Sequence, residues 1–347
     1  MYALSATDAI SPAIQRTKTF LFRPFKWGTF LKLSLVAVIT EGSGGNFKYS
    51  NSGGHSSSHS SSFYSPFNLT PGWIAAIVAV SLLTIVLSFI LYYLITRLRF
   101  AYFHCLIHNT KEIRPGWRLY RPQAARFFWL NVLVGFFFLL LVALVALPFV
   151  AGFWRLFRDT RAGGQPDVGL MLSLILPLIP IILLIVLAAF ATDVILRDFM
   201  LPHFALDNMT AGEAWAAVWA RIKAEKGRFF VYALLRAILP IAATIGLFIA
   251  MIIPGLMLGA VVVLAEIGLH SAFVNATGAA AFAGIFLEVL IGVVAFGIVL
   301  FAVICLGGPL STAVRQYALL FYGGRYQKLG DILFPPPEVS PSVPEIA

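Results

Sequence analysis

Six runs of mostly apolar residues alternate with shorter basic or polar segments along the chain. The runs lie at residues 25–40, 72–96, 126–150, 169–191, 229–253 and 279–306. A helix that crosses a bilayer needs about 20 mostly apolar residues, and only the first run is clearly shorter. We therefore predict an all-α integral membrane protein with about six transmembrane helices. Apolar residues continue beyond Pro254, and we interpret residues 255–268 as a broken continuation, either re-entrant or packed against the bundle.

An arginine followed by aromatic residues recurs three times at the start of an apolar run, with spacings of 103 and then 102 residues. We call these the elbow motifs: Arg23-Pro24-Phe25, Arg126-Phe127-Phe128 and Arg228-Phe229-Phe230. A second set, the return motifs, follows later apolar runs: Arg99-Phe100, Arg197-Asp198-Phe199 and Arg315-Gln316-Tyr317. A repeat of this length predicts three tandem helical pairs, with units at about 11–100, 110–200 and 210–310.

The segments before the elbow motifs carry signals of short amphipathic helices. Ser11-Pro12 resembles a capping residue followed by proline at the first helical position. The segment from Thr210 to Glu213 has the spacing of a capping box. After it, Trp215 and Trp219 share one helix face, opposite a basic face. Such helices lie in the membrane interface, so we predict that each repeat unit opens with an interfacial helix.

Basic residues are distributed unevenly between the alternate connecting segments. Segments 1–26, 97–126 and 192–228, together with the C-terminal tail, hold nineteen lysines and arginines, against four in the other connections. Basic connections stay on the cytoplasmic side. Six spans with both termini in the cytoplasm fit this distribution, whereas a seventh span at residues 255–268 would move the basic tail outside. The prediction is a protein of the inner membrane.

Composition supports this assignment and limits the partners. The chain is 60% hydrophobic and 12% charged, whereas soluble domains carry about 25% charged residues. The net charge is +10. We expect the excess basic residues to face membrane phospholipids, because no nucleic-acid-binding signature is present. We predict one transmembrane domain over residues 1–334, a flexible Gly/Ser/His outer loop at 42–66, and a disordered Pro-rich tail at 335–347.

Two interpretations of the elbow motifs are open. Their guanidinium groups would bind lipid phosphates in a bidentate fork, or they would serve as ordinary interface anchors beside an aromatic belt. The threefold recurrence favours the structural role. The candidate lipid-binding or anchoring residues are Arg23, Arg126, Arg228, Phe25, Phe128, Phe230, Trp215 and Trp219.

Charged residues within apolar runs are candidates for function, because such residues are rare in membranes. Arg236 lies about two turns into the fifth run, and Glu288 lies deeper in the sixth. At 1.5 Å per residue, their depths differ by roughly 15 Å, so we do not expect them to pair. Glu288 is the best candidate for a proton or cation site; the alternative is a protonated or hydrogen-bonded structural carboxyl.

Histidines offer only weak metal candidates. His104 and His108 share a helix face, and His203 occupies a position near that of His104 in the next unit. No carboxylate or CxxC pair accompanies them, so interfacial packing is the favoured interpretation and we predict no metal or other cofactor. Enzyme motifs such as HExxH, the P-loop and a Ser-His-Asp grouping are also missing from the sequence.

Two stretches resemble a known group of bacterial membrane proteins. They contain Phe22-Arg23-Pro24-Phe25 with Leu31-Lys32-Leu33, and Asp198-Phe199 through Trp215 to Arg228-Phe229-Phe230. They resemble the membrane domain attached to some glycerophosphoryl diester phosphodiesterases. The catalytic barrel of those enzymes is absent, so the resemblance implies a bacterial multi-pass membrane protein and transfers no activity.

The leading functional hypothesis is a non-enzymatic membrane protein that interacts with lipid or organises a protein partner, including a second copy of itself. The alternative is a transporter or channel for a small solute or ion that uses Glu288 and Arg236.

Overall fold

The computed structural model describes residues 4–42, 71–161, 168–273 and 277–335, and all regular structure in these ranges is helical. The predicted all-α class is therefore confirmed. The chain divides into two compact units. Unit 1 comprises Met1–Asn46, His104–Glu112 and Glu225–Ala347, and unit 2 comprises Phe47–Phe103 and Ile113–Ala224.

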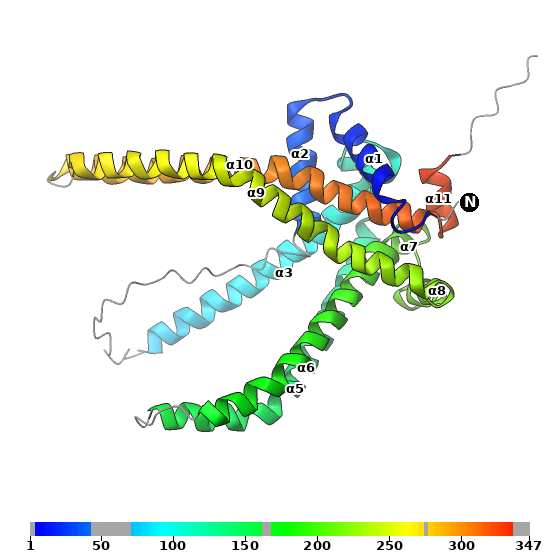
Figure 1. Cartoon of the computed structure of the whole chain (residues 1–347), viewed down its shortest axis with the longest axis horizontal. Coiled ribbons are helices and arrows are strands. Elements are labelled where there is room, and N and C mark those ends of the chain that lie inside the picture. Colours follow the sequence, from blue (N-terminus) through cyan, green and yellow to red (C-terminus); the bar gives the residue numbers. More distant parts are fainter. Residues whose placement is uncertain (1–3, 43–70, 162–167, 274–276, 336–347) are drawn as a thin grey trace, which may run out of the picture. The chain divides into compact units, whose positions relative to one another are not determined.

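Unit 1 is built around the C-terminal part of one long helix, α10 (Ala279–Gly323). Helices α1 (Ile10–Phe22), α2 (Trp27–Ala37), α9 (Lys226–Phe273) and α11 (Gln327–Leu333) all pack on it (Figure 1). Every residue from Val314 to Gly323 is buried. A helix that is surrounded on all sides in this way forms the core of its unit.

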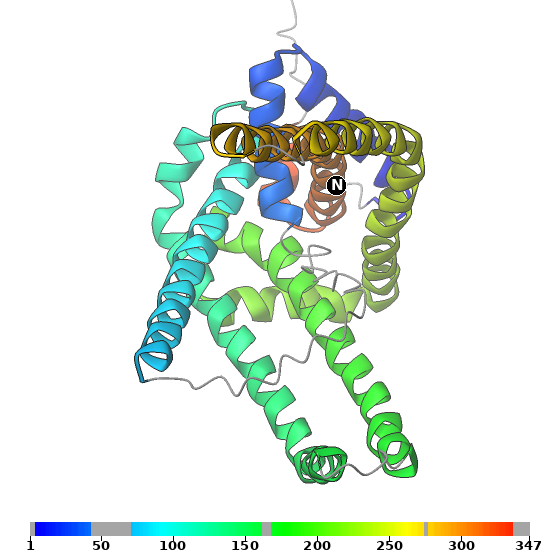
Figure 2. The ribbon, with the colours of Figure 1, turned by 90° about the vertical axis from the view of Figure 1, so that its left-hand side faces the viewer.

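Helix α2 crosses α10 instead of running beside it (Figure 1, Figure 2). The close approach is made by Gly308, where a Cβ atom would lie 2.6 Å from the Ser34 Cα. After α2, the chain continues as the π-helical turn η1 (Val38–Gly42). The missing side chain at Gly308 therefore lets the two backbones meet and brings η1 against unit 1's core.

Unit 2 contains α3 (Pro71–His108, whose last turn belongs to unit 1), α4 (Arg114–Leu119), α5 (Arg121–Arg161), α6 (Val168–Val194), η2 (Ile195–Met200), α7 (Leu201–Leu206) and α8 (Ala211–Ala224). Its core is aromatic. Phe127 packs edge-on against Phe100 at 5.5 Å and against Phe204 at 5.4 Å between ring centroids. Edge-to-face pairs at this distance are favourable beyond their burial.

Five described helices are long and apolar enough to cross a membrane. They contain residues Gly72–Ile107, Arg121–Arg158, Met171–Leu206, Lys226–Phe273 and Ala279–Gly323. The first predicted run, 25–40, instead forms α2 and η1, with 11 and 5 residues. The predicted count of six spans is therefore not confirmed, and neither is the arrangement in tandem pairs.

The interpretation of residues 255–268 as a broken continuation differs from the structure. α9 runs without interruption through Pro240 and Pro254 for 48 residues. Proline in a helix removes a hydrogen bond and usually bends the axis instead of ending it when the flanking sequence is strongly helical. At 1.5 Å per residue, α9 is roughly 70 Å long, whereas the hydrocarbon layer is about 30 Å thick.

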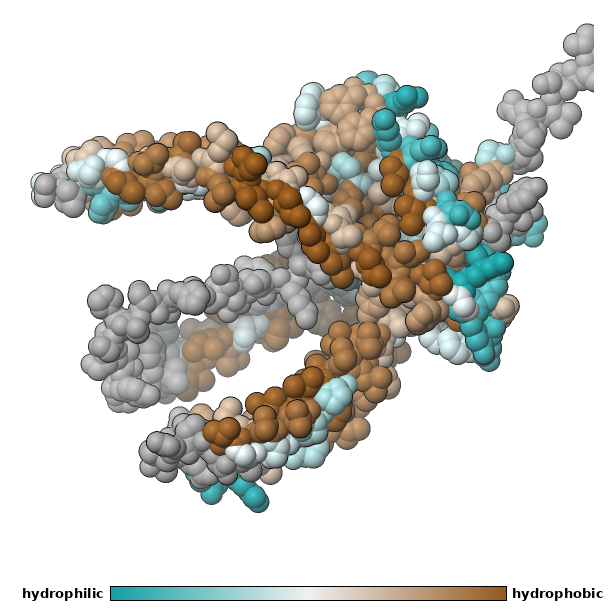
Figure 3. All heavy atoms as spheres, viewed as in Figure 1, coloured by the Kyte–Doolittle hydropathy of each residue, from teal (hydrophilic) through white to brown (hydrophobic). Residues whose placement is uncertain are grey.

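Within the described ranges, the apolar surfaces of the long helices are largely exposed. In each of the five helices, none of the residues in the most apolar 18-residue window is buried. Figure 3 shows apolar side chains along the α9–α10 hairpin and along α5 and α6. The buried cores lie instead near the helix ends that join the basic segments.

The predicted helix starts are confirmed in one case. The Thr210 backbone N–H donates to Glu213 Oε2 at 2.9 Å, and the Glu213 N–H donates to Thr210 Oγ1 at 3.5 Å, which is a capping box. α1 begins at Ile10, so Ser11 does not cap it. The predicted loop 42–66 and tail 335–347 lie outside the described residues, apart from Gly42 and Pro335.

Candidate functional site

The arginines of the elbow motifs all point outward, as an anchoring or lipid-binding role requires. Arg23 and Arg126 are exposed, and the Arg228 side chain is 60% exposed. Arg23 directly follows α1, whereas Arg126 and Arg228 lie inside α5 and α9, within two turns of their N-termini. Only the first elbow therefore separates two helices.

The aromatic residues of the elbow motifs divide between core and surface. Phe128 is buried against the ring of Tyr92 at 5.6 Å, whereas Phe25 and Phe230 are exposed. The neighbouring Phe127 and Phe229, which the sequence did not single out as site residues, are buried. The second motif thus places two aromatic residues in the core and the third motif one, which supports a structural contribution.

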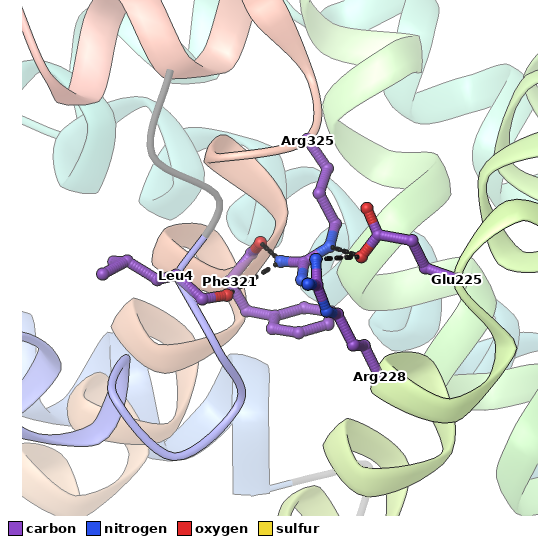
Figure 4. A network of polar contacts seen from close by, with 5 residues as sticks. All are labelled: Leu4, Glu225, Arg228, Phe321 and Arg325. Atoms are coloured by element: carbon purple, nitrogen blue, oxygen red, sulfur yellow. Dashed lines mark hydrogen bonds and ion pairs between the residues drawn. The ribbon is translucent and has the colours of Figure 1, made fainter.

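Arg228 belongs to a polar network that connects separate segments of unit 1 (Figure 4). Glu225 accepts from Arg228 at 3.2 Å and from Arg325 at 2.9 Å. Arg325 also donates to the carbonyl oxygens of Leu4 at 3.1 Å and Phe321 at 2.7 Å. Its guanidinium lies 4.0 Å from the Phe321 ring centroid, a cation–π contact. The network ties the N-terminal segment, the start of α9 and the end of α10 together.

Replacing Glu225 with glutamine is expected to lower stability at neutral pH and to have progressively less effect in acid. Burial alone would raise the pKa of Glu225, but hydrogen bonds and charge from Arg325 and Arg228 hold it below the usual 4.5. A carboxyl whose pKa is lowered by folding stabilises the fold above 4.5 and loses that contribution as pH falls through the folded value. Thermal unfolding of both proteins in detergent between pH 3.5 and 7 measures the difference.

The exposed Glu112 provides the matched control for this series. Glu112→Gln removes a carboxylate without removing an arginine contact. A Glu225→Gln protein that followed the wild type at every pH would show that the network contributes nothing to stability.

Two of the return-motif arginines, Arg99 and Arg315, are buried and Arg197 is nearly so, which the sequence pattern did not predict. Arg99 is 2% exposed, Arg315 is 1% exposed, and the Arg197 side chain is 11% exposed. Arg197 pairs with Asp193 at 2.6 Å, one turn away. The only sequence signal for this burial is the recurrence of arginine–aromatic pairs at the ends of apolar runs, and that recurrence does not by itself indicate burial. Buried guanidinium groups require acidic or carbonyl partners, so these motifs organise the interior.

Three charged residues from distant parts of the chain meet inside unit 1. Glu41 lies on η1, Arg236 on α9 and Arg315 on α10. Glu41 Oε2 is 3.7 Å from Arg236 Nη2, and Oε1 is 3.7 Å from Arg315 Nε. The three side chains are 4%, 14% and 1% exposed, in that order. We call this group the Glu41 cluster.

The Glu41 cluster explains how Arg236 is tolerated within an apolar helix. An isolated charge in a membrane is costly, and opposite charges or carbonyl groups normally offset it. Each oxygen of the Glu41 carboxylate faces one guanidinium, so Glu41 joins α9 to α10 through η1. The cluster thus places one carboxyl group between two guanidinium groups in largely buried surroundings. Arg236 was a candidate from the sequence; Glu41 was not.

Glu288 does not belong to this cluster. Its carboxylate lies 3.4 Å from His270 Nδ1, and the two side chains are 35% and 72% exposed. His270 lies near the end of α9 and Glu288 near the start of α10. The pair therefore joins the two helices close to the tip of their hairpin, and the expectation that Glu288 and Arg236 do not pair agrees with these partners.

The histidine candidates do not form a metal site among the described residues. The rings of His104 and His108 lie 4.5 Å apart. His203 is fully buried in unit 2, with Nδ1 3.4 Å from Asp207 and Nε2 3.3 Å from Arg221. No group of three or more His, Cys, Asp or Glu side chains in the described ranges has a metal-binding arrangement.

Trp215 and Trp219 lie side by side on α8 with ring centroids 6.0 Å apart and planes nearly parallel. They are 43% and 42% exposed, whereas the neighbouring Val218 is buried. Lys223 lies 5.8 Å from the Trp219 ring. α8 thus packs against the rest of unit 2 through Ala214 and Val218 and leaves its tryptophans partly exposed, as an interfacial helix would.

The all-helical fold, the five apolar helices and the buried charges define a multi-pass membrane protein. The chain belongs to a family of unknown function, DUF7544, whose model matches residues 4–332. No curated protein and no solved structure matches the chain. The resemblance to the membrane domain of glycerophosphoryl diester phosphodiesterases finds no support in these comparisons.

Proposed function

We propose that the protein is a non-enzymatic component of the bacterial inner membrane that interacts with lipids or organises a protein partner, with both termini in the cytoplasm. The observation that carries the proposal is the burial pattern of the long helices. Their most apolar windows contain no buried residue, whereas all residues of the return motifs near their basic ends are buried except Arg197, which is nearly so. The chain thus packs itself at the helix ends and leaves its apolar hairpins to be covered by other molecules.

This burial pattern differs from that expected of a protein that encloses a solute pathway. Such proteins gather polar groups in the interior of their spans. Here many large aliphatic side chains of the long helices are exposed, such as Leu139, Leu183 and Val294. Contacts between membrane helices depend on close packing of such surfaces with lipid or partner helices. The apolar hairpins therefore favour a lipid- or partner-covered role.

Simultaneous Arg23→Gln, Arg126→Gln and Arg228→Gln substitution tests the role of the elbow motifs. We expect loss of co-purifying phospholipid or of a protein partner, because three exposed guanidinium groups no longer face phosphates or partner carboxylates. Lipids and proteins retained after gentle detergent extraction are measured by mass spectrometry. Arg155→Gln with Arg158→Gln is the control, since both are exposed arginines outside the elbows. Unchanged lipid and protein content in the triple variant would overturn the proposal.

A transporter or channel is the second candidate, and the Glu41 cluster is the observation that favours it. Charged residues inside membrane-spanning segments often mark ion or proton paths. In proteoliposomes, a transport role predicts a proton or ion flux that Glu41→Gln or Glu288→Gln abolishes. The absence of flux in the wild-type protein would remove this candidate.

A further inference from the structure

An apolar cavity of about 220 Å³ lies in unit 1 beside α1. Its lining includes Ile10 and Ile14 of α1, Leu239 and Ala243 of α9, and Leu310 of α10. Pockets that enclose drug-sized ligands measure about 300–1,000 Å³. The cavity is therefore too small for such a ligand but has room for part of a single hydrocarbon chain.

The outer face of α1 continues from this cavity to a basic side chain. Ile14 lines the cavity and is 57% exposed, and Lys18 is exposed one turn further along the helix. Residues four apart share a helix face and differ by about 6 Å along the axis. Phe22, another turn on, is 42% exposed. Along this face of α1, the cavity opening at Ile14 is therefore followed by the Lys18 ammonium group and then by the Phe22 ring.

The end of α1 carries an exposed aromatic cluster that is typical of the membrane interface. The Phe22 and Phe25 rings stack with centroids 6.0 Å apart, and Trp27 meets Phe25 edge-on at 5.0 Å. Phe25 is 44% exposed and Trp27 is 61% exposed. Lys111 holds this turn by donating to the carbonyl oxygens of Arg23 and Pro24. Aromatic side chains of this kind gather at the headgroup level of bilayers.

The charged residues near the cavity favour a lipid with an anionic headgroup. Residues 10–37 contain no aspartate or glutamate, and their basic residues are Arg16, Lys18, Arg23, Lys26 and Lys32. Arg16 is already used within unit 1, because it donates to the carbonyl oxygens of Leu106 and Leu333. The exposed Lys18 lies nearest to the cavity along α1. Asp8, two residues before Ile10, is also exposed, so the surface beside the cavity is predominantly and not uniformly basic. A predominantly basic surface beside an apolar cavity complements an anionic headgroup joined to an acyl chain.

We propose that unit 1 binds one anionic phospholipid, with part of an acyl chain in the cavity beside α1 and the phosphate against the Lys18 ammonium. This inference rests on the proposed membrane function, because it requires α1 to lie at the bilayer surface. It adds to that function a defined lipid position that does not involve the arginines of the second and third elbow motifs.

The test uses the full chain, reconstituted in vesicles of equal parts phosphatidylglycerol and phosphatidylcholine and then extracted gently. Native mass spectrometry measures the lipid that each protein molecule retains. We expect the wild type to keep one phosphatidylglycerol. Lys18→Gln should lower the ratio of retained phosphatidylglycerol to phosphatidylcholine about fivefold, the effect of one basic residue near an anionic surface. Lys226→Gln, which removes an exposed lysine on α9, should leave the ratio unchanged.

A second pair of variants tests the cavity. Ala243→Phe places a ring in the cavity and should prevent retention of either lipid, whereas Ala242→Phe, at the adjacent exposed position that does not line the cavity, should not. Thermal unfolding shows whether both variants are folded. Equal retention by folded Ala243→Phe and Ala242→Phe, or retention of a second protein copy in place of lipid, would overturn the lipid site. If Ala243→Phe does not fold, the Lys18→Gln result decides alone.

The same samples separate this inference from the proposed function. Resistance of the wild-type protein to extraction by alkaline carbonate reports membrane embedding independently of the bound lipid. An embedded protein without the expected lipid would refute only the site beside α1. A protein released by carbonate would refute the membrane function as well.

Discussion

Replacing Glu41 with glutamine is expected to lower the free energy of unfolding by about 3 kcal/mol. Removing one partner from a buried ion pair typically costs about 3–5 kcal/mol, because a charge stays buried without compensation. The lower end applies here, since the Glu41 oxygens lie 3.7 Å from the guanidinium nitrogens and are not within hydrogen-bond distance. Thermal or denaturant unfolding in a mild detergent measures the change.

Glu288→Gln is the control for this substitution. It also removes a carboxylate paired with a basic side chain on a long apolar helix, but the pair is partly exposed. Exposed pairs contribute about 0–1 kcal/mol, so the control should stay close to the wild type. If Glu41→Gln were as stable as Glu288→Gln, the cluster would not join η1, α9 and α10.

Replacing Gly308 with alanine is expected to destabilise unit 1 by about 2 kcal/mol. The added methyl group would lie 2.6 Å from the Ser34 Cα and 2.5 Å from its Oγ, so the α2 backbone would have to move. Overpacking of this kind typically costs about 1–3 kcal/mol. Protease cleavage in the α2–η1 segment should increase together with the loss of thermal stability, since displaced α2 no longer covers α10.

The matched control is Gly297→Ala on the same helix. No atom lies within 4 Å of the position that its Cβ would take. Alanine favours helix over glycine by about 1 kcal/mol, so this variant should be unchanged or slightly more stable. Equal effects of the two substitutions would mean that α2 does not pack closely on α10.

The two predictions concern the same α2–η1 segment, because Gly308 of α10 contacts α2 and Glu41 lies on η1. The absence of a side chain at Gly308 lets α2 cross α10. That crossing brings η1, and with it Glu41, to Arg315. Loss of either residue is therefore expected to loosen the same region, although one acts through steric contact and the other through charge.

Local signals in the sequence predicted local structure well. The capping box at Thr210 and Glu213 forms with the expected bonds, because both partners lie within one helical turn. Five of the six apolar runs form long helices, since their composition leaves the backbone no partner in lipid other than itself. Residues 255–268 were interpreted differently because Pro254 suggested an interruption, yet α9 continues through it.

Contacts between distant residues were beyond reach of the sequence pattern. Glu41 borders a low-complexity Gly/Ser segment, and its position there looked like the start of a loop. Its importance appears only when η1 meets α9 and α10. The return motifs carried a recurring pattern, but recurrence alone does not distinguish an arginine that faces phosphate from one that is 1–2% exposed, as Arg315 and Arg99 are.

The sequence by itself determined that the chain is helical, membrane-embedded and basic at one set of helix ends, because hydropathy, helix length and charge are properties of contiguous residues. The tertiary structure decided which arginines are buried, how α2 crosses α10, and that Arg236 meets Glu41 rather than Glu288. These outcomes depend on close packing and on the cost of burying charge. Both act between residues far apart in the chain, and neither leaves a periodic signal in the sequence.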